Sequence, residues 1–250
     1  MVPTGRRRGE PARERKTLDR ALSRAGAMSR SQAQEAIAAG RVRVNGLRVR
    51  DPQVWVDLER DRVELDDAPL QAKALVYFAL HKPVGYVTTR SDERGRATVY
   101  ELLGERDAWI APVGRLDRET SGLLLFTNDT NWAERVTNPR SKLFKRYEVL
   151  ARGALDEAQL ERLRTGVELD DGGTAPARVE RLGEQGPDTR LALAIAEGRN
   201  RQVRRMLEAV GSRVLALHRV AIGPLELGGL AEGQTRKLKP FEVRALAGSV

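Results

Sequence analysis

The chain has 250 residues, a formal net charge of +9 and no cysteine. This length accommodates one large domain or a small domain beside a medium one, and the lack of cysteine excludes disulfides, thiolate metal sites and a cysteine nucleophile. Because the sequence has two histidines, a histidine-based zinc site or triad is hard to assemble. Any chemistry therefore depends on carboxylates, arginine, lysine, tyrosine and hydroxyls.

The positive charge is concentrated at the start of the chain. Residues 1–50 hold 13 Lys and Arg against 4 Asp and Glu, whereas residues 51–250 hold 31 of each. Clustered arginine favours a polyanionic partner, and nucleic acid is the first candidate. No apolar run reaches the roughly 20 residues needed to span a bilayer, and no apolar region of a secretory signal follows the first arginines. We expect a cytoplasmic protein without a membrane helix.

The first elements are predicted to be a tail and two short helices. Residues 1–15 contain Arg, Gly, Pro and Glu with little to bury, which predicts a disordered basic tail. Apolar residues at helical spacing follow over residues 17–26 and again over residues 29–40, and each run ends at a glycine. Ser31 and Gln34 have the spacing of a weak capping box for the second helix.

A hairpin is predicted next, in the sequence RVRVNGLRVR of residues 41–50. Two alternating runs flank an Asn-Gly pair, which is typical of a tight hairpin turn. Pairing Val44 with Leu47 places Arg43 opposite Arg48. Like charges directly opposite destabilise a hairpin, so an arginine face of one sign favours an anion-binding surface over an ordinary solvated face of mixed charge.

The segment TLDRALSRAGAMSRSQAQEAIAAGRVRVNG resembles the small RNA-binding domain named after the fourth small-subunit ribosomal protein. The resemblance covers about residues 16–70 and implies a small α/β module that binds structured RNA. The arginines that it implies face the RNA are Arg20, Arg24, Arg30, Arg41 and Arg43.

Residues 66–73 are expected to be a linker, and residues 74–250 a second domain. Strands are predicted over residues 75–80, 122–127, 147–151 and 190–196, and amphipathic helices over residues 155–163 and 202–210. Mixed element order and hairpin-length spacings favour an α+β fold with a largely antiparallel mixed sheet over a regular βαβ repeat.

The stretch GRLDRETSGLLLF places Asp117 between two arginines, directly before an apolar strand. Such an aspartate can be a turn residue that satisfies backbone donors. It can also be a catalytic carboxylate held at the rim of a rigid sheet. The spacing alone leaves both interpretations open.

Two further stretches are candidates for chemistry. Tyr147 leads the strand KRYEV, where it is either a core residue with an exposed hydroxyl or a surface on which a base stacks. The helix in EGRNRQVRRMLEAVG carries arginines at its N-terminal half, where the helix dipole prefers anions. No phosphate-binding glycine loop or HExxH pattern occurs in the sequence, which argues against nucleotide hydrolysis and zinc proteolysis.

Together these stretches resemble the bacterial ribosomal-RNA pseudouridine synthases of the RsuA/RluB type. The matching motifs are GRLDRETSGLLLFTND, RYEV, EGRNRQVRRM and LHKPVGYVTT, and the similarity runs from about residue 16 to 240. Two positions depart from the family pattern: Thr130 stands where many members have glycine, and Arg201 where several have histidine. Neither is expected to touch the catalytic aspartate, although Arg201 bears on the choice of RNA.

The resemblance implies a role for each site residue and no cofactor, metal or ATP. Asp117 is the ionised carboxylate, acting either as nucleophile at the anomeric carbon or as a base toward the sugar. Arg204 is its cationic partner, and Tyr147 stacks on the detached uracil. The residues implied to contact RNA or shape the pocket are Arg115, Lys82, Pro83 and Arg199.

The predicted reaction is the site-specific isomerisation of uridine to pseudouridine in ribosomal RNA by a monomeric enzyme. The target is more consistent with the large subunit, and the small subunit is the alternative. A hydrolytic glycosidase would need two carboxylates around the bond, whereas a non-catalytic RNA-binding or ribosome-assembly protein would explain the basic start equally well. The combination of Asp117, Tyr147 and Arg204 distinguishes the enzyme from the binding protein.

Overall fold

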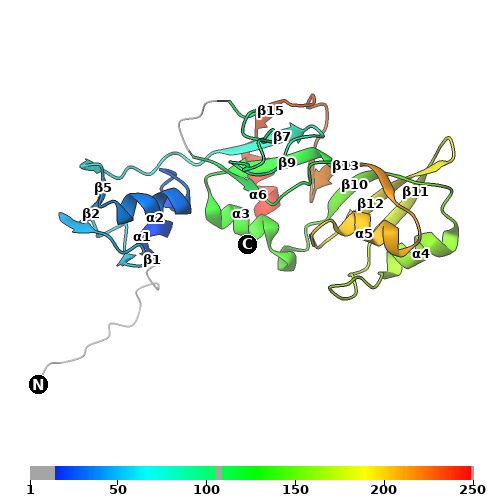
Figure 1. Ribbon diagram of the computed structural model, residues 1–250, viewed down its shortest axis with the longest axis horizontal. Helices are drawn as coiled ribbons and strands as arrows, with labels where there is room; N and C mark the ends of the chain where they lie inside the picture. Colours follow the sequence, from blue (N-terminus) through cyan, green and yellow to red (C-terminus); the bar gives the residue numbers. More distant parts are fainter. Residues whose placement is uncertain (1–14, 105–108, 249–250) are drawn as a thin grey trace, which may run out of the picture. The chain divides into compact units, whose positions relative to one another are not determined.

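The computed structural model describes residues 15–104 and 109–248, which divide into two compact units (Figure 1). The N-terminal unit contains the described residues up to Leu75 together with Trp109. The larger unit contains the described residues of Val76–Arg106 and Ile110–Val250. The predicted basic tail lies outside the described residues except for Arg15. No helix in the described ranges is long and apolar enough to cross a membrane.

The N-terminal unit packs two helices on small sheets. The helices are α1 Leu18–Arg24 and α2 Arg30–Ala38, and the strands are β1 Lys16–Thr17, β2 Val42–Val44, β3 Leu47–Val49, β4 Trp55–Val56, β5 Val63–Leu65 and β6 Ala68–Pro69. One sheet has the order β3-β2-β5-β6, and β1 pairs with β4. Leu18, Leu22 and Ile37 are fully buried between these elements. The helical spacing predicted from the sequence is explained by this shared core.

The predicted hairpin is confirmed in both turn and register. Asn45 and Gly46 have φ angles of 52° and 82°, which a tight primed turn requires. Val44 pairs with Leu47, and Arg43 lies opposite Arg48.

Two local predictions in the N-terminal unit are wrong. The capping box joins Ser29 to Gln32, because the Gln34 side chain instead donates to the buried Asp19 carboxylate at 3.0 Å. The first residues of the expected linker instead belong to the sheet. Asp66 and Asp67, both with positive φ, form the turn between β5 and β6. The sheet therefore continues through Pro69.

The larger unit is built on a nine-stranded sheet with the order β11-β12-β10-β13-β9-β7-β15, while β14 pairs with β13 and β8 pairs with β9. Its strands are β7 Tyr77–Lys82, β8 Ala111–Val113, β9 Ser121–Thr127, β10 Lys145–Ala151, β11 Arg178–Gln185, β12 Asp188–Ile195, β13 Val214–Ile222, β14 Leu225–Glu226 and β15 Thr235–Lys237. Its helices are α3 Thr130–Thr137, α4 Glu157–Thr165, α5 Gln202–Ala209 and α6 Pro240–Ala247, with a short 3-10 turn at Pro139–Ser141.

The sheet is antiparallel except where β13 runs parallel to β9, which confirms the predicted α+β class with a largely antiparallel mixed sheet. The four strands and two helices predicted in this unit correspond to β7, β9, β10, β12, α4 and α5, with ends that differ by two residues or fewer.

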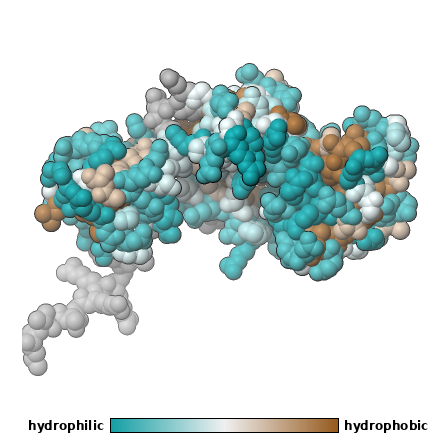
Figure 2. Space-filling model, viewed as in Figure 1, coloured by the Kyte–Doolittle hydropathy of each residue, from teal (hydrophilic) through white to brown (hydrophobic). Residues whose placement is uncertain are grey.

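Strand β9 is buried on both faces, which explains its continuous apolar sequence. Leu124 and Phe126 enter one core together with α4 and α5, whereas Leu123 and Leu125 enter the other core with α3 and α6. Polar residues cover much of each unit's face in Figure 2. The loop that carries Asp117 therefore leads directly into a strand that is packed in two cores.

Candidate active site

The loop between β8 and β9 carries Asp117 at the edge of the sheet, as the sequence predicts. The loop closes in a turn, with the Thr120 amide donating to the Asp117 carbonyl at 3.1 Å. Two buried cations stabilise the same turn through hydrogen bonds to its backbone. Lys82 Nζ donates to the Thr120 carbonyl at 2.8 Å, and Arg204 Nη2 donates to the Glu119 carbonyl at 2.9 Å. The Asp117 side chain is 28% exposed, so it combines a fixed backbone with access to solvent.

A cleft of about 420 Å³ opens beside this loop. Its walls come from the Asp117 loop, from β10, from the segment that precedes α5 and from β13. Five residues named from the sequence line it: Arg115, Asp117, Tyr147, Arg199 and Arg201. Asp117 and Tyr147 are thirty positions apart in the chain, and the sheet order brings them to one cavity. Tyr147 is 9% exposed, so its ring belongs to the core and to the cleft wall at once.

Arg201 is the cation nearest to Asp117 in the described part of the chain. Its Nη1 lies 3.9 Å from Asp117 Oδ2 and 3.3 Å from Glu119 Oε2. The expectation that this departure from the family pattern leaves the aspartate untouched is wrong. Burial opposes ionisation of Glu119, but hydrogen bonds from its own backbone and from Arg201 lower the pKa of Glu119 below its ordinary value.

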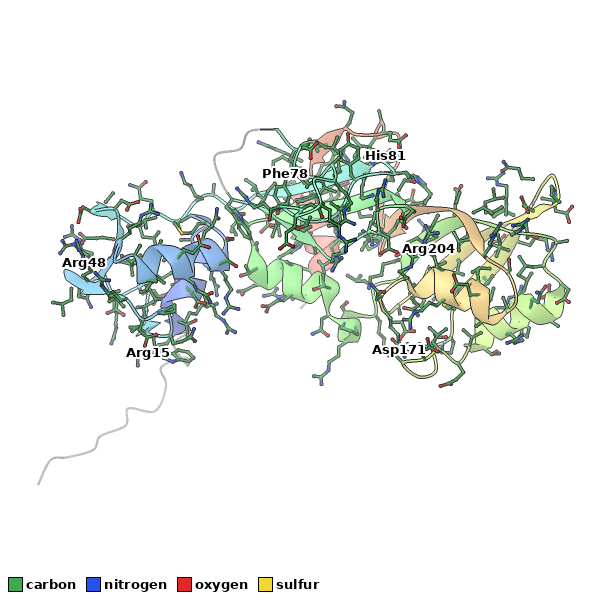
Figure 3. The ribbon with its side chains drawn as sticks, viewed as in Figure 1. Arg15, Arg48, Phe78, His81, Asp171 and Arg204 are labelled. Atoms are coloured by element: carbon green, nitrogen blue, oxygen red, sulfur yellow. The ribbon has the colours of Figure 1, made fainter. Side chains whose placement is uncertain are left out.

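Arg204, labelled in Figure 3, donates to the backbone of the Asp117 loop at the Glu119 carbonyl and makes no direct contact with the Asp117 carboxylate. It is 8% exposed, and its Nε has no hydrogen-bond partner among the described residues. Burial and the neighbouring Arg201 lower the pKa of Arg204, while the charges of Asp117 and Glu119 oppose that shift. Arg204, the predicted cationic partner of Asp117, therefore forms no direct ion pair with it here. The two residues are connected through the hydrogen bond from Arg204 to the Glu119 carbonyl and through the interaction of their charges.

Lys82 contradicts the prediction that it contacts RNA. Its side chain is fully buried, and its ammonium group donates to the carbonyls of Pro83 and Thr120, both at 2.8 Å. Burial lowers the pKa of Lys82 to about 8, with a further contribution from Arg219, and the charges of Asp117 and Glu119 oppose this. Lys82 therefore supports the backbone of the Asp117 loop from a buried position in β7.

The arginines of the N-terminal unit are exposed or half-buried, but their surroundings are not of one sign. Arg41 binds Asp66 at 2.5 Å, Arg43 binds Asp67 at 3.1 Å, and Arg30 binds the buried Asp19 at 2.9 Å. The prediction of an unmixed arginine face on the hairpin is thus wrong, because the turn between β5 and β6 supplies the carboxylates. Arg20 is exposed, and Arg24 is half-buried.

Two cleft residues, Lys145 and Arg219, were not singled out from the sequence. Both lie in strands that also carry apolar residues of the core. A charged residue inside an otherwise apolar strand such as VLALHRVAI is a signal, because burying a charge is costly without a partner or a ligand. Lys145 stands beside Tyr147 at strand spacing, so their side chains share one face of β10.

Comparison with known proteins supports the family resemblance seen in the sequence motifs, both by sequence and by structure. Residues 76–209 match the RNA pseudouridylate synthase family, and residues 16–63 match the S4 domain. An uncharacterized RNA pseudouridine synthase from Aquifex aeolicus is 41% identical, and the ribosomal large subunit pseudouridine synthase B of Bacillus subtilis is 38% identical. The two alignments cover 92% of this chain and 92% and 94% of those proteins.

A crystal structure of a pseudouridylate synthase superposes with a TM-score of 0.68 at 33% identity, over 92% of this chain and 99% of that one. The fold and site thus define an RNA-modifying isomerase with an S4 domain. The chain belongs to the RNA pseudouridylate synthase family.

Proposed function

We propose that the chain isomerises specific uridines to pseudouridine in ribosomal RNA, with the large-subunit RNA as the first target to test. The observation that carries the proposal is the shared cleft, in which Asp117 and Tyr147 meet beside the arginine-rich start of α5. The name of the Bacillus subtilis relative supports the large subunit. Small-subunit RNA is the alternative target.

The reaction requires the target uridine to leave its stack, since its glycosidic bond is inaccessible inside a helix, and this extrusion costs a few kcal/mol. Contacts between cationic side chains and the flanking phosphates offset that cost. Arg115 lines the cleft, which supports such a contact for its side chain. Arg199 also lines the cleft, but its guanidinium donates to the carbonyls of Gly172 and Gly173 at 2.7 and 2.6 Å, so a phosphate would have to share these donors. The exposed arginines of the N-terminal unit supply more of them.

Asp117 then acts on the ribose. It either attacks the anomeric carbon or removes a sugar proton, and in both cases the bond from C1′ to N1 breaks and the uracil is released within the cleft. Tyr147 stacks on the free ring while it turns, and a new bond forms from C1′ to C5. Lys82 and Arg204 keep Asp117 in place through the carbonyls of Thr120 and Glu119, because small displacements of a reacting group are costly in rate.

The test is the release of tritium from RNA labelled at C5 of uracil, with the unaltered chain and Asp117→Asn compared on large- and small-subunit RNA. We expect release by the unaltered chain alone and RNA binding by both proteins. The RNA that responds identifies the subunit. Equal release by Asp117→Asn would overturn the role of the aspartate, and RNA binding without release by either protein on RNA or ribosomal particles would favour a non-catalytic RNA-binding protein.

A further inference from the structure

A β-bulge brings Arg219 to the side of Tyr147. Along the pairing of β10 with β13, Arg146 lies opposite Ala221, but the next residue, Tyr147, lies opposite Arg219. The register therefore skips Val220. Bulges of this kind redirect side chains and are frequent next to active sites. Directly opposed residues of an antiparallel pair have their Cβ atoms about 4.5–5.5 Å apart on the same face, so Arg219 borders whatever stacks on Tyr147.

The Arg219 guanidinium is buried without a counter-charge. The residue is 5% exposed and lines the same cleft as Asp117. Its Nε donates to the Leu123 carbonyl at 2.7 Å, while its Nη2 has no hydrogen-bond partner among the described residues. No carboxylate in the described ranges lies within ion-pair distance of it. An uncompensated buried cation costs several kcal/mol, and this cost is expected where a ligand supplies the missing partner.

Lys145 adds a second cation to the same wall. It lines the cleft, is half-buried, and its Nζ donates to the Ala196 carbonyl at 3.3 Å. Burial lowers the pKa of Lys145, and the charge of Arg219 lowers it further. Two cations that repel each other thus border a cavity in which the ring of Tyr147 is the stacking surface.

We propose that the guanidinium of Arg219, assisted by Lys145, binds a carbonyl oxygen of the detached uracil and stabilises the negative charge on that ring. This inference rests on the proposed pseudouridine synthase function. When the bond from C1′ to N1 breaks, its electron pair stays with the ring and spreads over N1 and both carbonyl oxygens. After the ring turns, C5 uses an electron pair to bond C1′, and Asp117 is regenerated, either as its bond to C1′ breaks or as it returns the sugar proton. The proton on C5 then passes to water, and N1 takes up a proton, so the product is an isomer of uridine.

The burial of Arg219 favours the base over a phosphate as its ligand. A phosphate of the RNA backbone remains at the mouth of a pocket into which a base is flipped, where Arg201 is exposed at nearly half of its side chain. Arg219 lies deeper, at the level of Tyr147. Fixed donors in a water-excluded site are most effective toward charge that develops during the reaction.

The test compares Arg219→Met with the matched control Arg190→Met, which removes an exposed arginine from β12 of the same sheet. The readouts are the single-turnover rate of tritium release from uracil C5 and the dissociation constant for the same RNA. We expect Arg219→Met to lower the rate about 100-fold, as loss of one such donor does elsewhere, with RNA affinity changed less than about twofold. Arg190→Met is expected to match the unaltered chain.

Replacing one uracil oxygen by sulfur separates a direct contact from a structural role, because sulfur is the weaker hydrogen-bond acceptor. On RNA carrying 2-thiouridine or 4-thiouridine at the target, one of the two substitutions should slow the unaltered chain. The same substitution should have little further effect on Arg219→Met, since coupled contacts are non-additive. Arg219→Lys, which keeps the charge, should recover part of the rate. If the methionine variant does not fold, Arg219→Lys can replace it in the same comparison with the thio-substituted RNAs.

Three outcomes would overturn the inference. The thio substitutions could leave the unaltered chain unaffected, their costs could add to that of Arg219→Met, or Arg219→Met could weaken RNA binding as much as it slows release, as a phosphate contact would. Absence of release by the unaltered chain on both RNAs and on ribosomal particles would instead overturn the proposed function, and this inference with it.

Discussion

Two pairs of arginines, one pair in each unit, differ in what neutralises their charge. In the N-terminal unit, Arg41 is exposed and Arg43 is half-buried, and both form ion pairs with carboxylates of a neighbouring turn. In the larger unit, Arg204 and Arg219 are buried and donate to backbone carbonyls, and each keeps one nitrogen without a partner in the described residues. The first pattern is typical of a surface that can exchange one anion for another. In the second pattern, Arg204 fixes the Asp117 loop through a backbone carbonyl, and Arg219 places a positive charge at the wall of the cleft.

This contrast has an energetic basis. An exposed ion pair contributes about 0–1 kcal/mol to stability, so RNA phosphates can replace Asp66 or Asp67 at little cost. A buried cation loses much more solvation, so a substitution that removes or displaces its hydrogen-bond partners destabilises the folded protein much more. We therefore expect changes in the larger unit to affect folding and turnover, and changes on the hairpin to affect RNA affinity alone.

The largest effect is expected for Gly122→Ala, where β9 begins. A Cβ at this position would lie 2.3 Å from the Arg219 carbonyl oxygen and 2.5 Å from its amide nitrogen, and the residue has a φ of 108°. Because backbone cannot move aside as a side chain can, we expect a loss of more than ~4 kcal/mol in the free energy of unfolding. Thermal and urea unfolding of the purified protein measure it.

Gly153→Ala is the matched control for this change. Gly153 also has positive φ, at 79°, but its Cβ would meet nothing within 4 Å. A cost of about 1–2 kcal/mol is expected there from the left-handed backbone alone. Equal costs at the two glycines would show that the close approach of β9 to β13 is not required.

The next largest effect is expected for Arg204→Met, which removes the donor to the Glu119 carbonyl. Because Asp117 lies two residues before that carbonyl, the loop should relax, and a displacement of about 1 Å can lower the rate 100-fold. The measurements are single-turnover tritium release and RNA affinity, which should change less than about twofold. Arg205→Met is the control, since its guanidinium binds Asp171 away from the loop at 2.7 Å. An equal loss of rate in both variants would contradict the assigned role.

A smaller, pH-dependent effect is expected for Lys82→Met. The pKa of Lys82 is lowered from 10.5 to about 8 by burial, so between these pH values the unfolded chain binds the proton that the folded chain has released. Stability contributed by this residue therefore rises with pH over that window, by up to about 3 kcal/mol. The unfolding free energy of the unaltered chain minus that of Lys82→Met should increase from pH 7 to pH 10.5. A difference that stays constant with pH would show that Lys82 keeps an ordinary pKa.

Much of the fold was predictable because it depends on local patterns. The apolar run of β9 and the helical stripes of α4 and α5 follow from burial periodicity, and the hairpin turn follows from Asn-Gly. The capping box was misplaced because two serines compete locally, and the choice depends on the distant Asp19 binding Gln34. Tertiary contacts of this kind leave little trace in a short window of sequence.

The sequence predicted which residues lie together at the candidate site better than it predicted their contacts, since Asp117 and Tyr147 line one cleft. The motif resemblance identified Asp117, Tyr147 and Arg204, but it did not indicate that Arg201 pairs with Asp117. It also did not indicate Arg219, because its place beside Tyr147 results from a one-residue shift between β10 and β13. A register shift depends on three-dimensional pairing, so neither spacing nor composition reveals it.

The smallest effect is expected on the hairpin, for Arg41→Gln combined with Arg43→Gln. Loss of two phosphate contacts should weaken RNA binding about 3- to 10-fold near 0.1 M salt and reduce the slope of log affinity against log salt by about one to two. Turnover at saturating RNA should not change. Asp66→Asn combined with Asp67→Asn is the opposing variant, because it frees the same arginines while asparagine tolerates the positive φ of this turn. It should tighten binding and steepen the salt dependence. If both pairs of substitutions shift affinity in the same direction, the ion pairs serve the turn between β5 and β6 and the hairpin arginines are not an RNA surface.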